Sequence, residues 1–226
     1  MTNGETYITR LSAWAPGIES PSEWYEWAKG KREICAGAKG PDLSFADPMF
    51  RRRLSQISKM VVKVVHGLMP IGDDTKILFL SFQGEISRQF QINQVFIKDN
   101  VISPAAFSLS VFNAPVALAT MALGLKGGYT ALYPSNDSFT TGIKVAEAAL
   151  HSSSAGELAF VYADEEAPPN YGCFSEECPV PAAFGLLLSR TPQPNSVPLP
   201  VLSGEMTTPL TFLKHLLLHG GNLFSD

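Results

Sequence analysis

The stretch Ile102–Leu150, ISPAAFSLSVFNAPVALATMALGLKGGYTALYPSNDSFTTGIKVAEAAL, decides the fold. It reads as helix, strand, sharp turn and helix. Ser103-Pro104 predicts a helix start, with serine as the cap and proline at the first helical position. Pro115 interrupts this helical segment because it cannot donate to the preceding turn, and Gly124 ends it. Tyr129–Tyr133 is rich in β-forming residues and predicts a short strand.

A tight turn follows this strand. Pro134–Asp137, with the sequence PSND, has turn chemistry, and Asp137 or Asn136 is expected to cap the helix that runs to about Leu150. A turn from strand to helix exposes one side chain among the unpaired N–H groups of a helix N-terminus. Many enzymes hold a nucleophile at such an elbow, so this turn is the first place to look for one.

The segment resembles the N-terminal half of the β-ketoacyl synthases, which have a thiolase-type fold. In that family an I-S-P…N…A…G-L-(K/R)-G segment precedes a strand that ends in an elbow of the form A-C-(S/T/A)-S. The nucleophilic cysteine opens the next helix. The pattern fits Ile102–Pro104, Asn113 and Gly124–Gly127 without gaps. On this alignment Asn136 stands at the position of the cysteine, and the following serine is kept as Ser138.

The remaining chain alternates strands and helices, which predicts an α/β fold with a largely parallel sheet and helices on both faces. The resemblance covers most of residues 5–190 and implies a thiolase-like, layered fold. We expect one domain over residues 1–226, with a surface insertion near 19–45 that holds a short helix capped by Ser22. A linker and a helix through Leu218 are expected from 191. The other predicted strands are Tyr7–Trp14, Lys76–Gln83, Gly156–Tyr162 and Ala182–Arg190.

Two helices are predicted before the central stretch. Asp47-Pro48 starts one that an apolar stripe extends to Leu68. The other covers Glu85–Asn100, and its spacing predicts packing positions at Ile86, Phe90, Val95 and Phe96. The basic side chains of the first helix form either a solvated face or, as the resemblance implies, a docking surface for an acidic acyl carrier protein. They are Arg51, Arg52, Arg53, Lys59 and Lys63.

Composition restricts the kinds of partner. The 226 residues are 45% apolar and carry a net charge of −4, so nucleic acid is not an expected partner. No apolar run reaches the roughly 18 residues that a membrane span needs. The polar N-terminus gives no sign of a signal peptide. We therefore expect a cytoplasmic protein.

No metal or cofactor is expected. Cys35, Cys173 and Cys178 are interpreted as free thiols, although Cys173 and Cys178 leave a disulfide or a metal pair open. His215 and His219 are spaced to face the same side of a helix but lack a nearby carboxylate. His66, near a helix end, is interpreted as a packed or dipole-complementing histidine rather than a catalyst.

The residue at the elbow decides the expected chemistry. Condensation needs a thiolate to hold the acyl chain, and the amide of Asn136 cannot form a thioester. The two histidines that ketosynthases carry in a second half are not found in this sequence either. No catalysis by this chain alone is therefore expected. Ser135 or Ser138 could serve an acyl hydrolase or acyltransferase on a reused scaffold only if a distant histidine acted as base.

The resemblance is most specific to chain-length factors, which are catalytically silent ketosynthase homologues. Arg51–Ser55 and Phe107–Asn113 resemble the short ketosynthase-like proteins of bacterial aryl polyene clusters. This implies a non-catalytic subunit that pairs with a full-length β-ketoacyl synthase, as a heterodimer or heterotetramer, and shapes its acyl tunnel. An acyl carrier protein would bind transiently. A self-associating binding module is the other alternative.

The apolar strand Tyr129–Tyr133 lacks the charges that protect an exposed sheet edge, which favours pairing with a partner. The side chains near that interface could limit chain length by their bulk, or could simply pack in the core. The candidates are Phe107, Phe112, Asn113, Tyr129, Leu132, Tyr133, Asn136 and Phe139.

Overall fold

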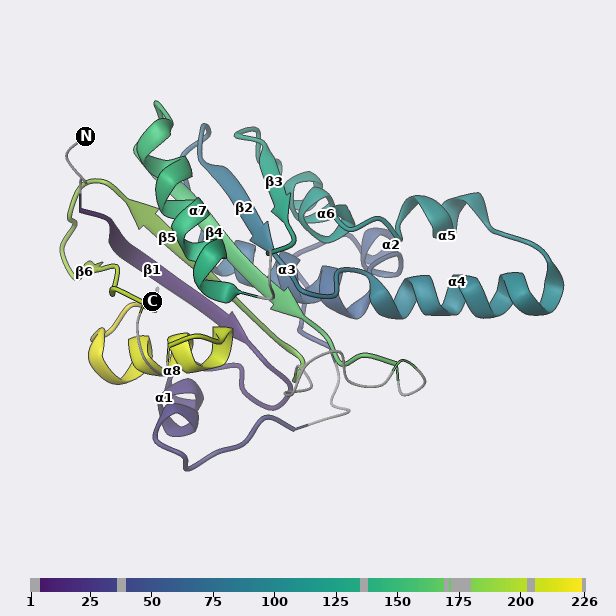
Figure 1. The fold of residues 1–226 in the computed structure, drawn as a ribbon, viewed down its shortest axis with the longest axis horizontal. Helices are drawn as coiled ribbons and strands as arrows, with labels where there is room; N and C mark the ends of the chain where they lie inside the picture. Colours follow the sequence, from purple (N-terminus) through teal and green to yellow (C-terminus); the bar gives the residue numbers. More distant parts are fainter. Residues whose placement is uncertain are drawn as a thin grey trace.

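The computed structural model describes residues 5–35, 40–134, 138–168, 171, 180–202 and 206–224. In this part of the chain, six strands form one sheet in the order β3-β2-β4-β5-β1-β6, with helices on both faces (Figure 1). The strands are β1 Tyr7–Trp14, β2 Lys76–Leu80, β3 Tyr129–Leu132, β4 Glu157–Asp164, β5 Ala182–Ser189 and β6 Val197–Pro198. The helices are α1 Pro21–Ala28, α2 Pro48–Arg51, α3 Gln56–Gly67, α4 Ile86–Asp99, α5 Pro104–Ser108, α6 Ala114–Leu123, α7 Phe139–Ser152 and α8 Pro209–His219.

The sheet is mixed, so the expectation of a largely parallel sheet was wrong. β3, β2 and β4 run parallel, because the crossovers that contain α4–α6 and α7 return the chain in the same direction. β5 instead lies antiparallel to both β4 and β1. The short strand β6 pairs with β1 inside the segment that was expected to be only a proline-rich linker.

The helix expected from Asp47 to Leu68 is two helices. Asp47 caps α2, and Ser55 caps α3 by accepting a hydrogen bond from the backbone N–H of Ser58. Ser55 also donates to Glu85, which fixes the chain at the break. The apolar stripe is continuous, but the chain forms two helices because Ser55 caps a new one and is held by Glu85.

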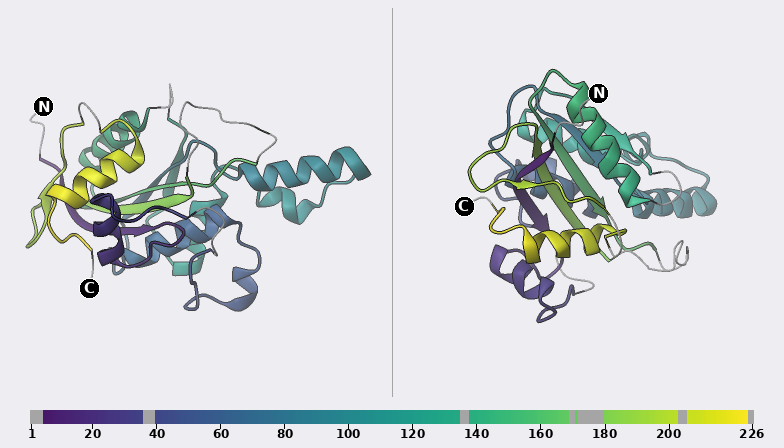
Figure 2. Two further views of the ribbon diagram at one scale, coloured as in Figure 1. Left: turned by 90° about the horizontal axis from the view of Figure 1, so that it is seen from below. Right: turned by 60° about the vertical axis from the view of Figure 1, so that its left-hand side comes forward.

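The sheet separates two apolar cores. Along β2 the side chains alternate between the two cores: Ile77 and Phe79 belong to the core with α3 and α6, whereas Leu78 and Leu80 belong to the core with α1, α7 and α8. Helices α3 and α7 lie on opposite faces of the sheet (Figures 1 and 2). Gly142 lets α7 approach the sheet, since a Cβ there would lie 2.5 Å from a methyl group of Leu80. Both faces of the sheet are therefore covered by helices of this chain.

Aromatic rings fill the core under α7 and α8. Phe139 is fully buried, and its ring centroid lies 5.3 to 6.3 Å from those of four neighbours. Those neighbours are Phe160, Tyr162, Phe184 and Phe212. Ser138 caps α7, whereas Asp137 or Asn136 had been expected to do so. At α1 the cap is likewise Ser20 rather than Ser22.

Helices α4 and α5 form an arm, residues 86–108, that projects from the body (Figures 1 and 2). None of the α4 side chains is buried. The expected packing positions Val95 and Phe96 are 48% and 45% exposed, and Ile86 and Phe90 are only half-buried. The prediction failed because the helix leaves the body, so that nothing in the described chain covers its outer end.

None of the described helices combines the length and the apolar character needed to cross a bilayer.

Candidate functional site

The carboxyl ends of the parallel strands β2, β3 and β4 meet at one edge of the sheet, which is the usual place for a site in a parallel α/β sheet. Tyr133 and Pro134, which follow β3 and precede the predicted elbow, lie at this edge. Ser135 and Asn136, which the sequence analysis singled out there, lie outside the described residues. Pro134 before them is buried, and Ser138 after them is described.

Ser138 acts as a structural cap. Its Oγ accepts a hydrogen bond from the backbone N–H of Thr141 and lies 2.6 Å from the hydroxyl of Thr140. The four histidines of the sequence make other contacts. His151 bonds Thr6, His66 stacks on Phe45, and the rings of His215 and His219 stack on each other. The base that a serine nucleophile needs is thus not supplied by any of these contacts.

Four of the interface candidates form one cluster at the edge strand. The side-chain amide of Asn113 donates to the hydroxyl of Tyr129 at 3.1 Å. The rings of Phe112 and Tyr133 meet edge to face, with centroids 6.4 Å apart. Phe112 and Asn113 precede α6, whereas Tyr129 opens β3 and Tyr133 follows it, so the fold brings these side chains together beside the edge strand.

A close approach at Gly84 holds this cluster in place. A Cβ at Gly84 would lie 2.6 Å from the ring of Phe112, and the residue has a φ of +56°, a conformation that L side chains rarely adopt. Gly84 therefore lets the turn after β2 pack against Phe112.

The other interface candidates are divided between surface and core. Phe107 on the arm is 57% exposed and Leu132 is half-buried. Phe139 lies fully buried in the aromatic core, so it faces no surface of this chain.

Sequence reasoning missed a group of buried carboxylates at the same edge. Asp164, at the end of β4, accepts hydrogen bonds from the hydroxyl of Ser81 at 2.6 Å and from the backbone N–H groups of Phe82 and Gln83. Burial raises the pKa of Asp164 to about 6 in spite of these donors. The carboxylate thus ties the end of β4 to the turn after β2.

Glu85 joins the arm to the body. It is fully buried and accepts from the hydroxyls of Ser55 at 2.6 Å and Ser58 at 2.7 Å. Arg88, one turn along α4, forms an ion pair with it at 3.2 Å. Because Arg88 also donates to the carbonyl of Arg53, the base of the arm is fixed to the start of α3.

Glu165 is the carboxylate of this group that has an oxygen without a hydrogen-bond partner among the described residues. It is 5% exposed, and its Oε1 is buried without a hydrogen-bond partner among the described residues. Burial raises its pKa to about 7, hydrogen bonds from Ser87 oppose the rise, and the charge of Glu85 adds to it. The signal that could have revealed the group is the acidic run after the buried strand β4, at the carboxyl edge of a parallel pair.

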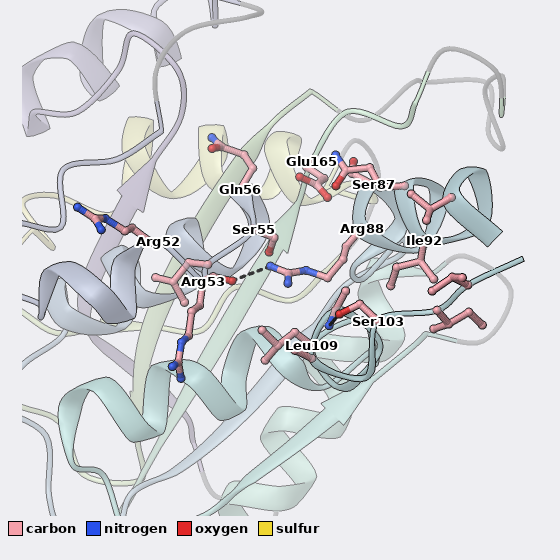
Figure 3. A pocket seen from close by; sticks show the side chains of 17 residues that line it. Arg52, Arg53, Ser55, Gln56, Ser87, Arg88, Ile92, Ser103, Leu109 and Glu165 are labelled. Carbon is pink, nitrogen blue, oxygen red and sulfur yellow. Dashed lines mark hydrogen bonds between the residues drawn. The ribbon is translucent and has the colours of Figure 1, made fainter. Parts of the chain in front are cut away.

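A cavity of about 840 Å³ lies beside these carboxylates, between the arm and the start of α3 (Figure 3). Ser55, Ser87, Arg88 and Glu165 line it together with side chains of α4 and α5. A smaller hollow of about 410 Å³ adjoins α2 and α3. Both cavities share Arg52 as a lining residue.

Four of the five candidate docking cations line one or both of these cavities. Arg52 and Arg53 line the larger one, and Arg51, Arg52 and Lys59 line the smaller one. Lys63 lies farther along α3 and is half-buried. Arg51 has a buried Nε without a hydrogen-bond partner in the described part of the chain.

The structure gives no support for a metal centre in the ranges it describes, because no three histidine, cysteine, aspartate or glutamate side chains come together there to hold an ion. His215 and His219 are neighbours, as their spacing predicts. Cys35 is an exposed free thiol. Cys173 and Cys178 lie outside the described residues.

Comparison with known proteins gives a consistent result. The family model described as "Beta-ketoacyl synthase, N-terminal domain" matches residues 24–208. The structure of the ketosynthase ApeO in complex with its chain length factor ApeC from Xenorhabdus doucetiae matches with 27% identity and a TM-score of 0.72. This match covers 82% of this chain and 79% of the matched chain. A search of curated proteins found no significant match.

Two more distant structures share the fold alone. The ishigamide ketosynthase/chain length factor is 13% identical, with a TM-score of 0.64 over 82% of this chain and 62% of that one. AntDE:AntF, a type II polyketide synthase acyl-carrier protein in complex with its ketosynthase, is 13% identical, with a TM-score of 0.60 over 82% and 63%. The chain therefore spans less than two thirds of these two. The matches confirm the expected thiolase-like α/β fold with helices on both faces.

Proposed function

Because the chain belongs to the family of β-ketoacyl synthase N-terminal domains, we propose that it is a non-catalytic, chain-length-factor-like subunit. It pairs with a full-length β-ketoacyl synthase and shapes the acyl tunnel in polyketide, specifically aryl polyene, or fatty-acid-type chain elongation. The proposal is carried by the alignment of Ile102–Leu150 with the family's pattern, in which Asn136 falls at the position of the nucleophilic cysteine. Without a thiolate the chain can contribute surface to the reaction chamber but cannot hold the acyl group.

The edge strand supports pairing with a partner. Ile77 and Ser81 donate to the carbonyls of Gly128 and Leu132, so the N–H groups of Tyr129 and Ala131 point away from β2. Within the described chain, β3 has no neighbour on that side. An exposed edge without protecting charges is a template for another strand.

The similarity to the ApeO–ApeC complex supports the same partner class. The shares of the two chains that are covered, 82% and 79%, are nearly equal, so the matched chain is about as long as this one. That chain is part of a ketosynthase–chain length factor complex. The basic side chains that line the two cavities, together with Lys63 farther along α3, are our candidates for transient docking of an acyl carrier protein. Those that line the cavities are Arg51, Arg52, Arg53 and Lys59.

The test is co-expression of this chain with each full-length β-ketoacyl synthase of its source organism, followed by gel filtration with light scattering at micromolar concentration. We expect one heteromeric peak. Ala131→Pro removes an outward N–H from the edge without removing a donor to β2, and should abolish the complex. Ala131→Val keeps that N–H and should leave the complex intact.

Two results would contradict the proposal. One is separate migration of the two proteins, which would favour a self-associating module if this chain forms a stable homodimer. The other is an acyl mass on Ser135 or Ser138 after incubation of the isolated chain with a thioester, which would favour the acyltransferase or hydrolase alternative.

A further inference from the structure

The arm is held to the body at its base. None of the α4 side chains is buried, so the helix has no core of its own. Glu85, just before α4, accepts hydrogen bonds from Ser55 and Ser58. Arg88, in the first turn of α4, donates to the carbonyl of Arg53. An element with so few buried contacts opens locally at a lower free energy than the whole domain unfolds. The base therefore decides whether the arm stays docked.

Glu165 links the arm to the centre of the sheet. It directly follows β4, and Ser87 in the first turn of α4 donates hydrogen bonds to it from the hydroxyl and from the backbone N–H. Figure 3 shows the two side chains beside each other. Strand β4 lies between β2 and β5, and nearly all its side chains are buried. A change at Glu165 is therefore expected to displace the arm rather than the strand.

Two other carboxylates act on Glu165. Asp164 precedes it at the end of β4, and Glu85 comes from the turn after β2. Burial raises the pKa of Glu165 to about 7, and the charges of Glu85 and Asp164 add to the rise. An ionised Glu165 would thus place a further negative charge in a region that already holds two carboxyl groups.

The cations of this region do not neutralise Glu165. Arg88 is ion-paired with Glu85 at 3.2 Å. Arg52 and Arg53 line the same cavity, but Figure 3 shows them on the side away from Glu165. Within the described ranges, no lysine or arginine nitrogen lies within 4.0 Å of its carboxyl group. A buried carboxylate without a cation is costly, so its ionised form favours any movement that admits water.

We propose that the arm is a pH-sensitive flap, which is closed while Glu165 is protonated and opens at its base when Glu165 ionises. The protonated carboxyl keeps its contact with Ser87 and adds no charge beside Glu85. The ionised carboxyl is stabilised by water that only the open arm admits. This inference goes beyond the proposed function, because the device belongs to this chain alone and requires no ketosynthase.

The direction of the response follows from the two states of one group. With the arm closed, Glu165 has a pKa of about 7, and in the open state its pKa should approach the ordinary value of 4.5. The closed arm is therefore most stable below about pH 5 and loses stability as pH rises to about 7. Above about pH 7 the opening equilibrium should level off. Between about pH 5 and pH 7 the equilibrium constant for opening should rise tenfold or more.

The experiment is hydrogen–deuterium exchange of the purified full chain between about pH 5 and pH 8, with each rate corrected for the intrinsic pH dependence of exchange. An undocked helix as short as α4 is marginal in water, so its amides exchange once the arm opens. We expect the protection of the α4 amides to fall about tenfold or more from pH 5 to pH 7. It should stay below that of α3, whose side chains pack in the core.

Low, non-denaturing urea separates opening of the arm from global unfolding. Opening of the arm exposes little surface, so the protection of α4 should depend only weakly on urea, whereas that of α3 should fall steeply.

Three variants assign the effect. Glu165→Gln cannot ionise and should keep α4 as protected at pH 7 as at pH 5. Ser87→Ala removes the hydroxyl that joins α4 to Glu165 and should increase opening at pH 5. Glu166→Gln, at the exposed neighbouring acid, is the matched control and should follow the wild-type curve.

The proposal is wrong if α4 and α3 show the same protection and the same dependence on urea, because the arm would then open only when the domain unfolds. It is also wrong if the protection of α4 does not fall between pH 5 and pH 7, or if Glu165→Gln keeps the wild-type pH dependence. Should Glu165→Gln fail to fold, the pH and urea dependence of the wild-type chain decides the question. Because no ketosynthase is present, a negative result here leaves the subunit proposal untouched.

Discussion

Two regions of the molecule are rich in apolar side chains: the arm, and the core beneath α7. Only the core is covered by other parts of this chain. Phe139 and Phe212 are completely buried under helices of this chain. On and beside the arm, Ile97, Val101 and Phe107 are 83%, 60% and 57% exposed. A contiguous exposed apolar surface usually marks an interaction site. The body therefore stabilises itself, whereas the arm has a surface that a partner or a ligand can cover.

The largest effect that tests this comparison is expected in the core. Phe139→Ala should lower the free energy of unfolding by about 3–5 kcal/mol, because it leaves a cavity between four aromatic neighbours. Phe107→Ala on the arm removes the same side chain from an exposed position and should cost less than about 0.5 kcal/mol. Urea denaturation of both variants measures the difference. Equal losses would contradict the division between core and arm.

The junction of the two regions should respond to pH. Burial raises the pKa of Glu165 from 4.5 to about 7 and that of Asp164 from 3.8 to about 6, so the folded chain binds more protons than the unfolded chain between these values. Stability should therefore fall as pH rises from about 4 to about 8. Glu165→Gln removes one of the two groups. Between pH 4 and pH 8, the free energy of unfolding of this variant should therefore fall by about 2–3 kcal/mol less than that of the wild type.

The measurement is the midpoint of urea unfolding across this pH range. Glu166→Gln, next to Glu165 but exposed, is the matched control and should follow the wild-type curve. A wild-type curve that rises over the same range would contradict the assignment of raised pKa values to the buried pair.

The smallest expected change is on the arm. Ile97→Ser alters an 83% exposed side chain, so the isolated chain should keep its stability within about 0.5 kcal/mol. If a ketosynthase covers the arm, the same variant should weaken the complex about tenfold, as expected for removing one buried aliphatic side chain from an interface. Unchanged affinity, measured by surface plasmon resonance, would exclude the arm from the interface while leaving β3 as the remaining candidate.

Local signals predicted the elements that depend on a few adjacent residues. Ser103-Pro104 starts α5, Gly124 ends α6, and β1 has its predicted bounds. The continuous helix from Asp47 failed because Ser55 caps a new helix and is held by Glu85, which lies 30 residues away. The packing of α4 failed because periodicity shows that a face is apolar but not whether anything covers it.

The sequence by itself predicted the family, which the family model confirms, and the start of α5 and the end of α6, since motif spacing and capping are properties of neighbouring residues. The elbow after β3 and the amide of Asn136 within it stay predictions. The structure alone decided that Phe112 meets Tyr133 and that Glu85 and Glu165 share one buried region. These pairs are distant in the chain. Their contacts and proton affinities depend on what the fold removes from water, which no local pattern records.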